Sequence, residues 1–135
     1  MPGDLVIGID ASTTATKAIA WDAQGRAHGE GRSMIPIANP RPGWWEQDPQ
    51  DWWSSAVAAV RELLGKVDAT RVKALAISNQ RETFGVFDAS GRALRPGTVW
   101  LDQRSHREVE RLVEQVGAER LHRISGKPAD VTGYR

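Results

Sequence analysis

The chain has 135 residues, with 18 Lys and Arg against 17 Asp and Glu, and its formal net charge of +1 gives no electrostatic case for nucleic acid or a membrane as a partner. It contains no Cys, which excludes disulfides and thiolate metal sites. No apolar run approaches the roughly 20 residues that span a bilayer and no signal peptide opens the sequence, so we expect a cytoplasmic protein.

The first third of the sequence predicts three consecutive antiparallel strands. Leu5 to Ile9 is a continuous apolar run, the pattern of a strand covered on both faces. A polar stretch, Ser12 to Thr16, separates it from a second strand, Lys17 to Trp21. Gly25 supplies the positive φ that a tight turn requires, and a third strand is expected within residues 26–35.

A helix is predicted from Pro49 to Leu64, after an irregular segment at residues 36–46 that contains three prolines. Asp48 is expected as its N-cap, and Gly65 is expected to end it. Helical spacing assigns four apolar residues to the inner face: Trp53, Val57, Val60 and Leu64.

The second half predicts two strands and two helices. The strands are Val72 to Ile77 and Phe84 to Phe87, and a turn at residues 88–93 nearly repeats the earlier one at residues 22–27. The first helix is expected at Gln103 to Val116 and a shorter one at residues 119–124. Four apolar residues are assigned to the inner face of the first: Val109, Leu112, Val113 and Val116. The element order indicates an α/β fold with a mixed sheet and flanking helices, and the absence of a closing element leads us to expect an incomplete domain.

Several common chemistries are excluded. Gly126-Lys127 is followed by Pro128, so the Gly-x-x-x-x-Gly-Lys-Ser/Thr nucleotide motif is missing. Residues 29–31 lack the third glycine of a dinucleotide fingerprint, and no Gly-x-Ser-x-Gly elbow occurs. The three histidines show no metal-ligand spacing: His28, His106 and His122.

The segment from Asp10 to Lys17 has the composition of a phosphate site. It combines a carboxylate at the end of an apolar strand with hydroxyl side chains, free backbone N–H groups and one cation. The carboxylate of Asp10 supplies a hard oxygen of the kind that magnesium binds. On composition alone, an ordinary Thr-rich hairpin with a solvated Lys explains the segment equally well.

Four ordered blocks resemble the FGGY family of carbohydrate kinases, in its glycerol kinase and xylulose kinase branches. Asp10 to Lys17 resembles the first phosphate motif of the actin-like ATPase superfamily in its FGGY version. The other three blocks are Arg41 to Pro49, Ile77 to Thr83 and Val99 to Arg104. The resemblance implies a ribonuclease H-like α/β domain, with residues 1–135 forming part of the amino-terminal domain and the carboxy-terminal domain absent.

The resemblance also implies ATP- and Mg²⁺-dependent phosphorylation of a sugar or polyol. By it, four residues would bind the nucleotide phosphates, namely Ser12, Thr13, Thr14 and Lys17, and Asp10 would serve the metal. Ser12 stands where the family usually has Gly, which brings a side chain close to the phosphates.

The same resemblance assigns acceptor residues. Arg81 and Glu82 would hold adjacent hydroxyls, although without the family match they would be a surface ion pair. Trp100 would form an apolar wall, with core packing as its alternative, and Asp102 would add a polar contact. Tyr134 would take the place of an aromatic that contacts the acceptor. The family match leaves three further residues as structural: Trp44, Trp45 and Glu46.

No catalytic residue is expected within this chain. The general base of the family is an Asp that lies well downstream, so we expect residues 1–135 alone to be inactive and their partner to be the rest of the kinase chain. The sequence leaves open whether the protein forms a homo-oligomer. The alternatives are a regulatory or interaction module derived from such a kinase, and an ATPase without a sugar acceptor. Arg81-Glu82 beside Trp100 and Asp102 argues against the ATPase.

Overall fold

The computed structural model describes residues 3–129, and the chain divides into two compact units. The first unit comprises the residues up to Ile37 together with Asp48–Gln80, and the second comprises Ala38–Gln47 and the residues from Arg81 onward. No helix within residues 3–129 is long and apolar enough to cross a membrane.

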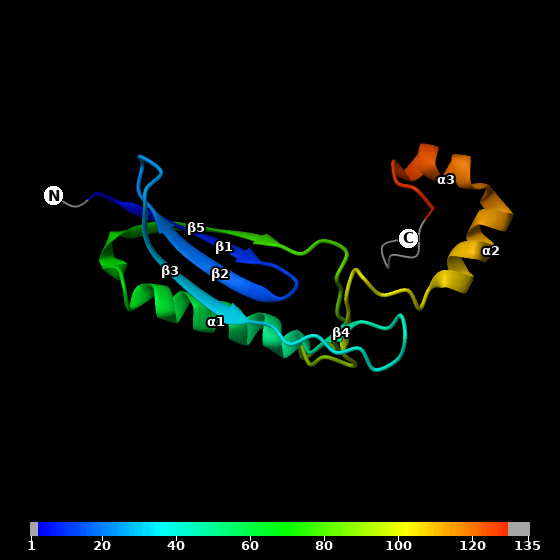
Figure 1. Cartoon of the computed structure of the whole chain (residues 1–135), viewed down its shortest axis with the longest axis horizontal. Helices are drawn as coiled ribbons and strands as arrows, with labels where there is room; N and C mark the ends of the chain where they lie inside the picture. The colour runs from blue at the N-terminus through cyan, green and yellow to red at the C-terminus, as the bar shows by residue number, and fades with distance from the viewer. Residues whose placement is uncertain (1–2, 130–135) are drawn as a thin grey trace. The chain divides into compact units, whose positions relative to one another are not determined.

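A four-stranded mixed sheet forms the first unit (Figure 1). Its strands are β1 (Leu5–Ala11), β2 (Ala15–Trp21), β3 (Ala27–Met34) and β5 (Val72–Asn79), in the order β3-β2-β1-β5. β1, β2 and β3 pair antiparallel, as predicted, and β5 lies parallel to β1. A parallel neighbour needs a crossover connection, and α1 (Pro49–Leu64) lies in that connection.

The sheet buries one face in the described residues. Leu5, Ile7 and Ile9 are buried in the core, whereas Val6 is 47% exposed. The prediction that this strand is covered on both faces is therefore wrong for residues 3–129. The buried face packs on α1, which Figure 1 shows along one side of the sheet. On β5, Ile77 is 66% exposed.

The predicted bounds of α1 are confirmed, but its predicted inner face is correct only in part. Val60 packs against the core and Val57 is half-buried, whereas Leu64 is exposed. Asp48 Oδ1 accepts a hydrogen bond from the backbone N–H of Gln50 at 2.9 Å, which is the expected N-cap. The residues buried within the helix are Pro49, Ser55, Ala59 and Leu63, whereas Trp53 is 68% exposed. At Ala59 and Leu63 the backbone of the helix passes very close to Gly31 of β3.

Two turns, at Asp22 and Asp88, are built in the same way. In each, the aspartate Oδ1 accepts hydrogen bonds from the backbone N–H groups two and four residues further on, at 2.9 and 3.0 Å. Gly25 and Gly91 have φ of 75° and 81°, which confirms the predicted role of glycine. A hydrogen bond from His28 and the turn N–H groups holds the pKa of Asp22 far below its usual value.

The second unit contains short strands and two helices. β4 (Glu46–Gln47) pairs antiparallel with β6 (Gly97–Thr98). The strand expected at Phe84 to Phe87 is reduced to isolated bridges, in which Phe84 pairs with Thr98 and Phe87 pairs with Ala93. A continuous strand is therefore not formed, and the prediction is wrong there.

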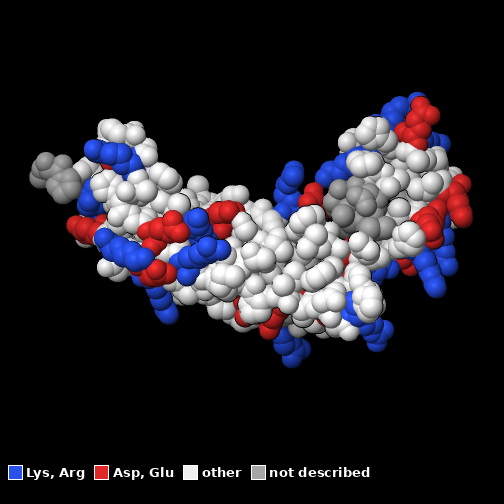
Figure 2. Space-filling view, in the orientation of Figure 1, with Lys and Arg blue, Asp and Glu red and all other residues white. Residues whose placement is uncertain are grey.

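The two predicted helices of the second unit are present as α2 (His106–Val116) and α3 (Ala118–Ser125). α2 begins three residues later than predicted. The four residues predicted for its inner face are the half-buried ones, Val109, Leu112, Val113 and Val116. Figure 2 shows acidic and basic side chains interspersed on this helix pair, as expected from the near-zero net charge.

Candidate phosphate and acceptor sites

The hairpin of β1 and β2 brings the predicted phosphate residues together in the first unit. Asp10 and Lys17 are direct cross-strand partners. The Ser12 hydroxyl donates a hydrogen bond to Asp10 Oδ2 at 2.7 Å, and the Ser12 N–H donates to the carbonyl of Ala15 at 3.0 Å. The tight turn between the strands therefore holds a carboxylate, a hydroxyl and a cation at one end of the hairpin, with Thr13 and Thr14 in the turn itself.

A shallow depression of about 360 Å³ adjoins this corner on the open face of the sheet. Asp10 and Lys17 line it, together with residues of all three neighbouring strands, namely Gly8, Ile9, Ile19, Trp21, Ala76, Ile77 and Ser78. The ammonium of Lys17 lies 3.7 Å from a carboxylate oxygen of Glu30, and both side chains are nearly half exposed. An exposed pair at this distance is weak, so Lys17 is able to turn toward another anion.

A further hydroxyl of the corner, Thr16, has a structural role. It is fully buried, and its Oγ1 lies 2.8 Å from Oγ of Ser55 on α1. This hydrogen bond satisfies two buried hydroxyls and fastens β2 to the helix. The sequence offered a signal for it, because Thr16 follows the alternation of buried residues along β2.

Asp10 fits a magnesium ion as a single ligand. Within residues 3–129 no group of three or more His, Cys, Asp or Glu side chains is arranged to hold a metal. Mg²⁺ bound to a nucleotide commonly takes only one or two protein carboxylates, with phosphate oxygens and water completing its shell. The exposed carboxylate of Asp10 beside the hydroxyl corner meets that requirement.

The predicted acceptor residues lie in the second unit. Arg81 is exposed, and Glu82 has φ of 65°, in the left-handed region. Trp100 is 40% exposed, which disfavours the core-packing alternative, and its backbone N–H donates to Thr83 Oγ1 at 3.1 Å. That hydrogen bond places Trp100 next to the loop that carries Arg81 and Glu82. Tyr134, the remaining predicted contact, lies outside the described residues.

Asp102 lies inside a network of protein donors instead of facing a pocket. It is 2% exposed. Its Oδ1 accepts from the N–H and Nε of Arg104, at 2.9 and 2.8 Å. Its Oδ2 accepts from Nη2 of Arg104 at 2.8 Å and from the N–H of Trp45 at 2.7 Å. Four hydrogen bonds from the protein occupy the acceptor positions of this carboxylate, so the structure gives Asp102 a structural role where the sequence suggested a polar contact with the acceptor.

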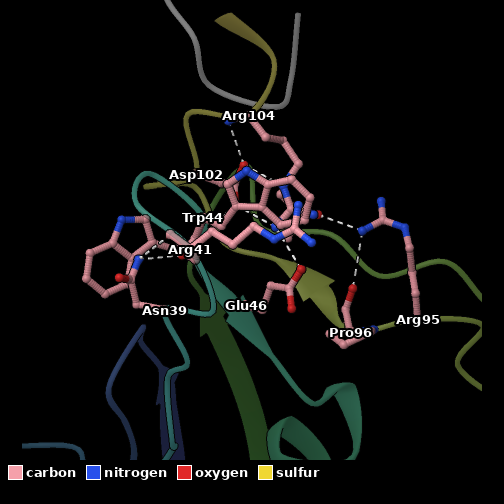
Figure 3. Close-up of polar contacts among 10 residues, drawn as sticks. Asn39, Arg41, Trp44, Glu46, Arg95, Pro96, Asp102 and Arg104 are labelled. Atoms are coloured by element: carbon pink, nitrogen blue, oxygen red, sulfur yellow. Dashed lines mark hydrogen bonds and ion pairs between the residues drawn. The ribbon is translucent and has the colours of Figure 1, made fainter.

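Arg104 is the centre of this network (Figure 3). Its guanidinium also donates to Glu46 Oε1 at 2.8 Å, and it stacks on the ring of Trp44, with 3.9 Å from Cζ to the ring centroid. Arg41 stacks on the same indole at 5.0 Å. Trp44 and Glu46 are thus structural, as predicted, because they hold the segment before β4 against the segment after β6.

Two residues that contact the predicted acceptor residues were missed in the sequence. Arg104 was part of a recognised block but received no role, although a planar, always charged guanidinium next to Asp102 could have indicated one. The second is Lys127, whose ammonium lies 3.0 Å from Glu82 Oε1. Nothing in the spacing of the sequence pairs two residues that are 45 positions apart.

Lowering the pH should remove the contribution of ionised Asp102 to the stability of the fold. Burial raises the pKa of this carboxyl, but the hydrogen bonds from Arg104 and from the N–H groups of Trp45 and Arg104 outweigh burial and hold the pKa below its usual 3.8. A lowered pKa stabilises the fold above that value, and the stabilisation is lost as pH falls through the folded-state pKa. The free energy of unfolding of Asp102→Asn should therefore lie well below that of the native sequence at pH 7, and the difference should narrow below about pH 4.

Urea unfolding at pH 7, 5, 4 and 3 measures this difference. Other carboxyls with lowered pKa values, such as Asp22 and Asp88, remain in both proteins, so their contributions to the pH dependence cancel in the difference. A difference that stays constant over the whole pH range would contradict the assignment to Asp102.

Comparison with known proteins shows that the sequence and the fold are similar to those of carbohydrate kinases. The sequence pattern described as "FGGY family of carbohydrate kinases, N-terminal domain" matches residues 5–133. The chain is 36% identical over 112 residues to a glycerol kinase of Acinetobacter baylyi, covering 81% of this chain and 23% of that protein. It is 37% identical over 128 residues to a glycerol kinase of Beutenbergia cavernae, covering 93% and 25%.

The fold is shared with a ligand-bound xylulose kinase from Lactobacillus acidophilus, with a TM-score of 0.86 at 24% identity, over 94% of this chain and 26% of that one. These results confirm the expected class, an α/β fold with a mixed sheet and flanking helices. The chain belongs to the FGGY family of carbohydrate kinases and matches its N-terminal domain. It spans about a quarter of the length of these relatives.

Proposed function

We propose that this chain is part of an ATP-dependent kinase that transfers a phosphoryl group to a hydroxyl of a sugar or polyol. The first unit would supply the first phosphate loop, and the second would supply part of the acceptor site. The observation that carries the proposal is the pairing of Asp10 with Lys17 beside a hydroxyl-rich turn, in a chain that belongs to a carbohydrate kinase family. The glycerol kinases among its relatives support a polyol as the acceptor class.

In the proposed nucleotide site, the turn between β1 and β2 would donate hydrogen bonds to the phosphates, and Lys17 would neutralise part of their negative charge. The hydroxyls and N–H groups of Ser12, Thr13 and Thr14 would bind phosphate oxygens, as anion-binding turns do. Lys17 would leave its exposed pair with Glu30, which costs at most about 1 kcal/mol, and bind the transferred phosphate. Asp10 would hold Mg²⁺, and the ion would offset negative charge on the phosphates.

In the acceptor part, Arg81 would donate to hydroxyls and Glu82 would accept from them, while Trp100 would contact the carbon chain. Asp102 would act through Arg104, by fixing the segment that carries Trp100, and not by touching the acceptor. Tyr134 remains a predicted contact. The general base is expected downstream of residue 135, so the rest of the kinase chain is the partner this proposal requires. A cytoplasmic location belongs to the same proposal.

The test is an ADP-release assay with ATP and Mg²⁺ on the full open reading frame that contains residues 1–135, with the 135-residue chain in parallel. The acceptor panel holds glycerol, erythritol, ribulose and xylulose. We expect turnover of at least one acceptor by the long form only. Bound ATP without turnover of any acceptor would contradict the acceptor assignment and favour an ATPase or a regulatory module.

Variants separate the two parts of the proposal. Lys17→Met should lower kcat/KM for ATP about 100-fold, because a charged hydrogen bond to phosphate is lost. Glu82→Gln should lower kcat/KM for the acceptor by a similar factor, mainly through KM. Arg92→Met, which removes an exposed turn cation paired with Asp88, is the matched control and should leave both values unchanged. Equal kinetics for all of these proteins would contradict the assignment of both sites.

A further inference from the structure

Glu82 has a backbone conformation that needs outside support. Among residues 3–129, Glu82 is the only residue other than glycine with a positive φ, at 65°. The left-handed region is unfavourable for a residue with a Cβ, and such residues persist where surrounding contacts hold them in place. The contacts of this side chain therefore bear directly on how it is presented.

The ammonium of Lys127 holds the side chain of Glu82. Nζ lies 3.0 Å from Glu82 Oε1, and the glutamate side chain is only 19% exposed. Both residues line a pocket of about 440 Å³, whose other walls are mostly apolar: Val109, Leu112, Leu121, Ser125, Pro128 and Ala129. An ion pair beside apolar walls is less screened by water than one on an open surface, so it fixes geometry more firmly.

The end of α3 presents Lys127 for this contact. Gly126 closes the helix with φ of 70°, and the N–H of Lys127 donates to Ser125 Oγ at 3.1 Å. Ser125 Oγ donates in turn to the carbonyl of Leu121 at 2.7 Å. The turn after α3 is thus ordered by its own hydrogen bonds, and the lysine leaves it toward Glu82.

We propose that Lys127 is a positioning residue for the acceptor-binding carboxylate of Glu82. This inference rests on the proposed function. Lys127 occupies Oε1, and within residues 3–129 no hydrogen bond to Oε2 is found, so Oε2 is the oxygen that accepts from an acceptor hydroxyl. The ammonium also balances the negative charge of Glu82. Binding of a neutral polyol or ketose therefore does not require the desolvation of an unpaired carboxylate, which would be costly.

Steady-state kinetics of the full open reading frame test this role. Lys127→Met should raise KM for the acceptor about 10-fold, because a charged hydrogen bond no longer orients Glu82, while kcat and KM for ATP change by less than about 2-fold. Lys127→Arg keeps a cation at the same place and should restore most of the affinity. Arg123→Met, which removes another cation from α3, is the matched control and should behave as the native sequence.

A double variant separates positioning from stability. If Lys127 acts through Glu82, then Lys127→Met should have almost no further effect on the acceptor KM in a Glu82→Gln background. Should Lys127→Met fail to fold, the Lys127→Gln and Lys127→Arg variants carry the same comparison.

The outcomes distinguish this inference from the proposed function. Turnover by the native sequence with an unchanged KM in Lys127→Met, or with an equal loss in the Glu82→Gln background, overturns the role of Lys127 and leaves the kinase intact. A native sequence that phosphorylates no acceptor overturns the proposed function, and the role of Lys127 in acceptor binding is then overturned with it.

Discussion

Replacing Gly31 by Ala should destabilise the first unit by at least about 3 kcal/mol, because the added methyl group has no room. A Cβ at this position would lie 2.7 Å from the backbone nitrogen of Leu63 and closer still to the carbonyl oxygen of Ala59. Both atoms belong to the main chain of α1, so a side-chain rotation does not relieve the clash. The helix has to move away from β3, which opens its contacts with the core residues Leu5 and Ile7.

Gly8 offers a matched control on the neighbouring part of the sheet. A Cβ there meets only Nε1 of Trp21 at 3.8 Å, an ordinary contact distance. Gly8→Ala should therefore leave the free energy of unfolding unchanged or raise it by up to about 1 kcal/mol, since Ala restricts the unfolded chain.

Urea unfolding, with hydrogen exchange to localise the loss to β3 and α1, measures both variants. Similar unfolding midpoints for Gly31→Ala and Gly8→Ala would contradict the close approach of helix and sheet.

The same close approach explains where sequence reasoning about the fold succeeded and where it failed. The bounds of α1 follow from local chemistry, an Asp at the N-cap, a Pro in the first turn and a Gly at the end, and these were predicted correctly. Its inner face depends on what lies opposite. Helical spacing selects the large apolar residues such as Trp53, but Gly31 lets the helix backbone approach the sheet, and Ala59 fits there.

The site shows a similar division. The sequence predicted the antiparallel strands on either side of the turn between β1 and β2, and in the hairpin they form Asp10 and Lys17 are cross-strand partners. Asp102 was predicted to contact the acceptor because a block of residues resembles a family pattern. Such a pattern does not show which groups form hydrogen bonds with a side chain. Three of the four hydrogen bonds to Asp102 come from Arg104, only two residues further on, but the fourth comes from Trp45, 57 positions away. The pairing of Glu82 with Lys127 likewise joins residues far apart in the chain.

Removing the guanidinium of Arg104 should be the most damaging single change in the second unit. Arg104→Met leaves the buried Asp102 with only backbone donors and leaves Glu46 without its cation. Loss of one member of a buried ion pair costs roughly 3–5 kcal/mol, and because Arg104 is partly exposed at 24% we expect about 3 kcal/mol, toward the lower end. The indole of Trp44 also loses its stacked cation, so its fluorescence should shift.

Arg104→Lys tests whether charge alone is sufficient. A lysine keeps the positive charge, but its single nitrogen does not reproduce the planar set of donors that reach both oxygens of Asp102 and Glu46 together. We therefore expect Arg104→Lys to lose most of the stability that Arg104→Met loses, whereas Arg92→Met at an exposed ion pair should change the unfolding free energy by less than about 0.5 kcal/mol.

Urea unfolding of these three variants, monitored by Trp fluorescence, decides whether a positive charge alone or the directed hydrogen bonds of the guanidinium stabilise this network. Full stability in Arg104→Lys would mean that a point charge is enough and that the geometry of the network is unimportant. A large loss in both Arg104 variants, with Arg92→Met unaffected, would show that directed hydrogen bonds hold the segment that carries Trp100. In that case the stability of this network, and not a contact of Asp102 with the acceptor, explains why an Asp and an Arg follow Trp100 at this spacing.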